Sequence, residues 1–109
     1  DYFTKAHELD PSQVDVAREA GIAATEMGDG PAAVRFTKAA IAAKPDDAGL
    51  ASNLALAHLI CGSVQEAQVA AIQAVSRAPA DPVAQAVRSL VEDVATGKRP
   101  CPKSGRELG

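Results

Sequence analysis

Residues 28–45 read GDGPAAVRFTKAAIAAKP, and residues 62–79, which lie 34 positions further on, read GSVQEAQVAAIQAVSRAP. Both stretches begin with glycine, end with proline and carry alanine at their sixth and thirteenth positions. Glycine and proline interrupt helices, whereas alanine is the strongest helix former, so each stretch predicts one helix between two turns. Ala6 and Pro11 extend the same spacing toward the N-terminus. A shared period of 34 residues indicates a repeat architecture.

The segments around these two stretches are helical in character as well. We expect the end of a helix over residues 1–9 and further helices over about 12–27, 31–43, 48–61, 63–77 and 82–96. Ser63 and Glu66 match a capping box at the start of the fourth of these helices, and Asp81 precedes Pro82 at the start of the last. The expected unit is therefore a pair of helices.

The composition of the chain agrees with closely packed helices. Of its 109 residues, 24 are alanine and only three are aromatic, and hydrophobic residues make up 47%. This is enough apolar surface for one small domain. No apolar run approaches the roughly 20 residues that span a bilayer, so we expect no membrane helix. The first residues carry neither methionine nor a signal-peptide stretch, and we expect a fragment of a longer protein.

Helix pairs of this length, with glycine between the helices and proline after the second, resemble the tetratricopeptide repeat (TPR) family. The resemblance covers residues 1–97. The residues that match the family pattern are Gly21, Gly28, Asp29, Ala33, Ala40 and Pro45 in one repeat, and Leu54, Gly62, Ala67, Ala74 and Pro79 in the next. Two departures concern large aromatic positions, where this chain has Ala17 and Ala51 early in the first helices and Ala24 and His58 in the middle.

The resemblance implies an all-α fold, a right-handed superhelical solenoid of antiparallel helix pairs. Its parts would be two full repeats at 14–47 and 48–81, flanked by half repeats at 1–11 and 82–97. Residues 98–109 would follow as a basic, flexible tail. Small alanines at facing positions would let the helix axes approach closely. We expect Ala40 and Ala74 to be buried at such contacts.

The charge is unevenly distributed along the chain. Residues 1–97 carry 13 acidic and 7 basic side chains, whereas residues 98–109 carry 4 basic and 1 acidic. An acidic body disfavours a nucleic-acid surface, and the short proline-interrupted tail is typical of a solvated terminus. Cys61 and Cys101 match neither a disulfide framework nor a zinc-ligand spacing. These features favour a reducing, cytoplasmic compartment, and the alanine content suggests a bacterial source.

Catalytic patterns are missing from the sequence. His7 and His58 are isolated, and residues 28–30 lack the phosphate-loop pattern and follow a helix rather than a strand. The adjacent carboxylates at 46–47 and 92–93 are typical of a turn and of a solvated helix face. We therefore expect no enzyme activity, no cofactor and no metal site.

The first helices of the repeats would line a concave groove. Their helical spacing places eight candidate partner-binding residues there, namely Arg18, Ile22, Asn53, Leu56, Leu59, Ile60, Leu90 and Val94. Chaperone-binding members of the family hold a peptide carboxylate with a clamp of basic and amide side chains. Only Arg18 and Asn53 match that clamp, whereas Ile22, Val83 and Val87 stand at its other positions, so we expect no clamp.

The sequence thus predicts a scaffold that binds a peptide or helix of a partner protein in an apolar groove. Burial of the same residues within the chain is the competing interpretation. Two further functions stay open. One is self-association through the open solenoid ends at residues 1–9 and 82–96, and the other is a regulatory segment of a larger enzyme.

Overall fold

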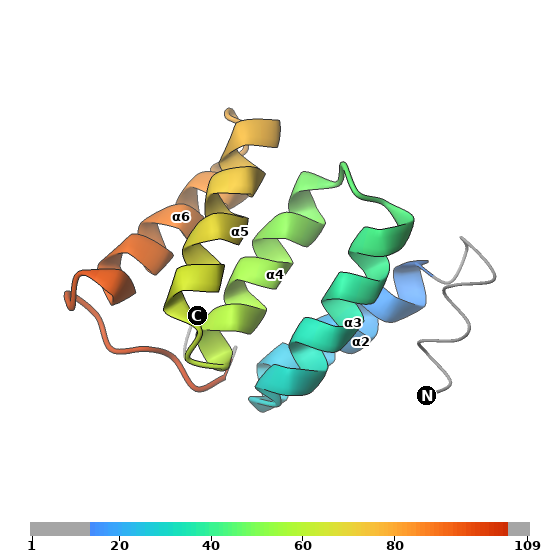
Figure 1. The fold of residues 1–109 in the computed structure, drawn as a ribbon, viewed down its shortest axis with the longest axis horizontal. Coiled ribbons are helices and arrows are strands. Elements are labelled where there is room, and N and C mark those ends of the chain that lie inside the picture. Colours follow the sequence, from blue (N-terminus) through green and yellow to red (C-terminus); the bar gives the residue numbers. More distant parts are fainter. Residues whose placement is uncertain (1–13, 105–109) are drawn as a thin grey trace.

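The computed structural model describes residues 14–104, and this part of the chain contains helices and no strands (Figure 1). The helices are α2 (Val14–Met27), α3 (Gly30–Ala43), α4 (Ala48–Ile60), α5 (Val64–Arg77) and α6 (Pro82–Ala95). All five helices expected over this range are confirmed. The helix end expected at residues 1–9 lies outside the described residues.

The first helix of every pair ends in the same backbone motif. Gly28, Gly62 and Gly97 all have a positive φ, between 77° and 81°. The amide that follows each glycine donates to a carbonyl five residues earlier: Asp29 to Ala24 at 2.8 Å, Ser63 to His58 at 2.8 Å and Lys98 to Asp93 at 2.9 Å. This is the Schellman motif, which needs a left-handed residue and so favours glycine. The repeat seen in the sequence is therefore also a repeat of backbone geometry.

Aspartates start three of the helices. The carboxylates of Asp29, Asp47 and Asp81 accept hydrogen bonds from amides in the first turns of α3, α4 and α6. The capping box expected at Ser63 is not formed as predicted, because the side chain of Ser63 makes no cap hydrogen bond at the start of α5. The carboxylates at 29 and 47 thus have a structural role that their turn-like sequence context did not reveal.

Alanines fill the helix contacts. Ala33, Ala40, Ala67 and Ala74 are all fully buried, at 0% exposure. The expected burial of Ala40 and Ala74 is confirmed. A methyl side chain leaves little space between two helix backbones, so α3 and α5 approach their neighbours closely with few large side chains in the core.

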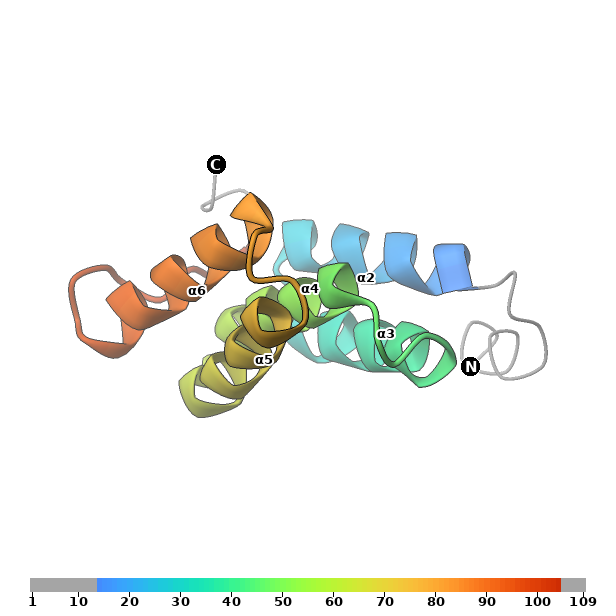
Figure 2. The same ribbon diagram turned by 90° about the horizontal axis from the view of Figure 1, so that it is seen from above.

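α4 is the central helix of the molecule. It packs against α2, α3, α5 and α6, and α2 and α6 lie on one side of it while α3 and α5 lie on the other (Figure 2). The largest buried cluster joins α4, α5 and α6 around Leu59 and Val91. Because α4 has neighbours on almost every side, its sequence is apolar around most of its circumference. None of the helices in residues 14–104 has the length and apolar character needed to cross a membrane.

The end of the helical array at α6 is only partly open. Val83 is 60% exposed, whereas Val87 and Val91 point into the core and are nearly or fully buried. The apolar stripe of α6 therefore packs mainly on α4 and α5 within the chain. Val83, in the first turn, is the one large aliphatic side chain of α6 that is mostly exposed.

The basic tail differs from the solvated terminus that we expected, as far as residue 104. After α6 the chain turns back along the lower edge of the molecule and reaches the end of α4 (Figure 1). The thiol of Cys101 donates to the carbonyl oxygen of Leu59 at 3.0 Å, and Pro102 is buried. The tail therefore packs against the helical body.

Candidate interaction groove

The repeat places aliphatic side chains at equivalent positions on the three first helices. Ile22, Leu56 and Leu90 follow one another at intervals of 34 residues, on α2, α4 and α6. Ile22 is 38% exposed, and the other two are half-buried. Each helix thus contributes one aliphatic group that solvent still reaches. We name these three residues the aliphatic row.

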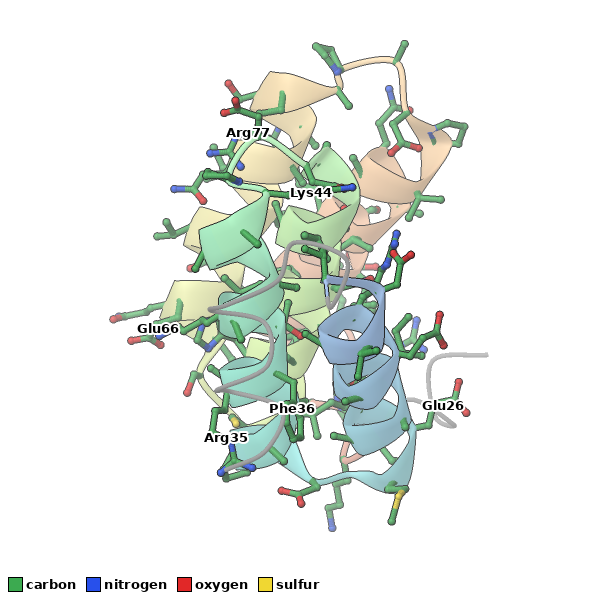
Figure 3. All side chains as sticks on the ribbon, turned by 90° about the vertical axis from the view of Figure 1, so that its right-hand side faces the viewer. Glu26, Arg35, Phe36, Lys44, Glu66 and Arg77 are labelled. Atoms are coloured by element: carbon green, nitrogen blue, oxygen red, sulfur yellow. The ribbon has the colours of Figure 1, made fainter. Side chains whose placement is uncertain are left out.

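A second set of equivalent positions continues this pattern one helical turn further on. Glu26, Ile60 and Val94 are also 34 residues apart, and solvent reaches all three. Glu26 points away from the helices at the end of α2 (Figure 3). The two sets together form a gradient, with one aliphatic and one acidic residue on α2 and only aliphatic residues on α4 and α6.

Leu59 does not belong to this surface. Its side chain is 0% exposed and lies in the core cluster with Ala55, Ala67 and Val91. The expectation that Leu59 lines the groove is therefore wrong. The accessible side of α4 carries Gly49, Asn53, Leu56 and Ile60, and a residue one position before Ile60 is rotated by about 100° toward α5 and α6.

Leu56, Leu90 and Val94 serve the core as well as the surface. All three are partly buried and pack against the cluster that contains Leu59. Part of each of these side chains is therefore buried within the chain, as the competing interpretation expected. A substitution of Leu56 has to be expected to affect folding as well as any partner.

Charged residues dominate the α2 end of this surface. Asp15, Glu19 and Glu26 are exposed, and Asp15 accepts a hydrogen bond from the guanidinium of Arg18. A hollow of about 480 Å³ lies on α2 and is lined by Asp15, Val16, Glu19 and Ala20. Arg18 is paired with Asp15, and the net charge of Asp15, Arg18, Glu19 and Glu26 at this end is negative. Asn53 is half-buried at the middle of α4.

The central histidine is part of the core. His58 is only 9% exposed, and burial lowers its pKa, with a smaller contribution in the same direction from the charge of Lys38. Glu66 acts in the opposite direction. The buried imidazole thus stands on α4 where the sequence comparison expected a large aromatic side chain. Ser52 on the same helix is buried too, and its hydroxyl oxygen has no hydrogen-bond partner among the described residues.

The two cysteines stay apart from any cluster of ligands. Cys61 and Cys101 are both free thiols, and in residues 14–104 no group of three or more His, Cys, Asp or Glu side chains is arranged to hold a metal ion. Burial raises the pKa of the Cys61 thiol, and the charge of Asp29 adds to this effect. A raised pKa disfavours the thiolate, the reactive form of cysteine.

The contacts of the tail were not expected from the sequence. Cys101 and Pro102 are among the tail residues that contact the body, and both were expected to lie in a solvated terminus. The one available signal was the pair of prolines at 100 and 102, which favours an extended backbone. The two prolines predict the backbone conformation of the tail but not the surface on which it packs, so they could not predict the contact with α4.

Comparison of the chain with protein-family models, with curated proteins and with solved structures gives no significant match.

Proposed function

We propose that the chain is a protein-interaction module of TPR type, a right-handed solenoid that binds an amphipathic peptide or helix of a partner on its first-helix face. The observation that carries this proposal is the aliphatic row. Three partly exposed side chains at equivalent repeat positions form a ladder with regular spacing. Solenoids present such repeated positions to extended or helical ligands.

The charge gradient determines the chemistry of the partner. Aliphatic residues of the ligand would lie against the aliphatic row and against Val94. A lysine or arginine of the ligand would lie toward Asp15, Glu19 and Glu26 on α2. Binding would therefore combine apolar anchors, which supply most of the affinity, with an electrostatic preference for orientation.

A displayed library of random peptides, selected on the full chain, tests this function directly. We expect enriched peptides to share spaced aliphatic residues and a basic residue at one end. Ile22→Asp should then weaken the best peptide by about tenfold or more in fluorescence anisotropy, because it introduces a charge into an apolar contact. Ile22 is already partly exposed, so the variant should melt like the wild type.

Val69→Asp is the matched control for this experiment. Val69 is an exposed aliphatic residue at 58%, but it lies on α5, a second helix. This variant should bind the selected peptide as the wild type does. Peptides that bind equally to wild type and Ile22→Asp, or a selection without a shared pattern, would contradict the proposal.

Self-association is a second candidate function, favoured by the exposed Val83 at the start of α6. Two copies could cover this residue by pairing their α6 ends. Light scattering over a range of protein concentrations should then show a dimer that Val83→Lys dissociates. A mass equal to that of the monomer at every concentration would rule out this alternative.

A further inference from the structure

The segment from Lys98 to Ser104 contacts the body at two places that belong to different repeats. The first is the end of α4. The Cys101 Sγ–H donates to the Leu59 carbonyl oxygen at 3.0 Å, and the Gly62 amide donates to the same oxygen at 2.9 Å. A carbonyl oxygen has two lone pairs and accepts both bonds. The tail thus uses acceptor capacity that the helix end leaves available.

The second contact is the turn between α2 and α3. A Cβ atom built on Gly28 would lie 2.7 Å from the carbonyl oxygen of Lys103 and 3.4 Å from the Cβ of Ser104. The absence of a side chain at residue 28 is therefore needed for the tail to pass. The equivalent Gly62 has the same backbone geometry, but a Cβ there would meet no described atom within 4 Å. The tail selects one of two similar turns.

Between these contacts the tail buries one of its two prolines. Pro102 is buried, whereas Pro100, two residues earlier, is exposed. Proline has no amide hydrogen, so its burial leaves no donor without a partner. Residues 99–103 also line a hollow of about 330 Å³. A buried proline next to a hydrogen-bonded side chain is the pattern of a docked peptide.

We propose that the end of α4 and the α2–α3 turn together form a peptide-binding site, the edge site, and that residues 98–104 of the chain occupy it. The ligand class is an extended segment in which a side-chain hydrogen-bond donor is followed directly by proline, here Cys101 and Pro102. The Leu59 carbonyl oxygen accepts the hydrogen bond from the donor, and the proline is buried against the body. The backbone that follows the proline fits because Gly28 has no side chain. The edge site does not depend on a partner in the groove.

Protease protection of the full chain tests whether the tail occupies the edge site. A lysine-specific endoprotease cleaves after Lys98 and Lys103, and mass spectrometry separates the two products. Cleavage after Lys103 should be about tenfold or more slower than in a free peptide of residues 98–104, because a docked segment has to open before it is cut. Pro102→Ser should raise this rate to that of the corresponding free peptide.

Pro100→Ser is the matched control, since it changes the exposed proline of the same tail. It should leave the protection after Lys103 intact. Both variants should keep the helical circular dichroism and the melting temperature of the wild type, which would show that only the tail has been released. Equal, fast cleavage of wild type and both variants would overturn the proposal. Protection that disappears on dilution would overturn the assignment of the occupant, because the tail of a second copy would then be the ligand.

Binding in trans tests the edge site itself. The probe is a fluorescent peptide of residues 98–104 in which serine replaces Cys101, so that it retains a donor and cannot form a disulfide. It should bind the Pro102→Ser chain, whose own tail is released, at least about tenfold more tightly than the wild type. A peptide with serine at both 101 and 102 should lose this binding. No difference between the two peptides would contradict the site.

Discussion

Gly21 on α2 faces Thr37 on α3 so closely that a Cβ atom on Gly21 would lie 2.7 Å from Thr37 Oγ1. In the second repeat, different residues form the equivalent contact. The equivalent positions are Ala55 and Ala71, which are both buried and belong to one core cluster. A glycine facing a threonine in one repeat thus corresponds to two alanines in the next. The total volume at the contact is similar, as close packing requires.

This relationship predicts a compensated double variant. Gly21→Ala alone should lower the free energy of unfolding by about 1–3 kcal/mol through overpacking, despite the better helix propensity of alanine. Adding Thr37→Ala should restore most of this loss, since it recreates the pair found in the second repeat. Chemical denaturation of the four variants of the cycle measures the coupling. Additive effects of the two substitutions would mean that the contact does not limit the packing.

The alanine interior predicts a strong difference between two neighbouring positions of α3. Ala40 is fully buried and Ala42 is exposed. Ala40→Leu should destabilise the fold by about 1–3 kcal/mol, because the added methylene and methyl groups have no space. Ala42→Leu should stay within about 0.5 kcal/mol of the wild type. Thermal melts of both variants provide the measurement, and a neutral Ala40→Leu would contradict the tight helix contact.

The packing of the aliphatic row predicts that its members differ in their importance for folding. Leu56 packs against the main core cluster, so Leu56→Asp should destabilise the fold by about 2 kcal/mol or more. Ile22→Asp, at a more exposed position of α2, should cost much less. Urea unfolding of both variants distinguishes the two roles. If Leu56→Asp unfolds at the same urea concentration as the wild type, the side chain of Leu56 does not contribute to the stability of the core.

The buried histidine predicts a loss of stability in mild acid. Burial lowers the pKa of His58 in the folded chain, so the unfolded chain takes up the proton first as the pH falls. The free energy of unfolding should therefore decrease below the ordinary histidine pKa of about 6.5, until the lowered folded pKa is passed. Unfolding titrations between pH 7.5 and 5.5 measure this slope. His58→Gln should reduce the slope, and an unchanged slope would assign it to other groups.

The helices could be predicted from the sequence because their signals are local. Gly28, Gly62, Pro45 and Pro79 impose backbone limits that hold in any context, and the 34-residue spacing between equivalents repeats them. The burial of Ala40 and Ala74 followed from the same spacing, because a repeated small residue on a helix indicates a repeated close contact. Three of the four groove residues expected on α4 also lie on its accessible side: Asn53, Leu56 and Ile60.

The tertiary structure decided what depends on contacts between distant segments. Leu59 and Ile60 are adjacent and both aliphatic, and only the position of α5 and α6 determines that Leu59 is buried in the core while Ile60 stays accessible. The tail is the clearest case. Its bond from Cys101 to Leu59 spans 42 residues, and no periodic pattern in the sequence records such a contact. Local backbone preferences are encoded residue by residue, whereas the burial of a single side chain depends on which surfaces the folded chain brings against it.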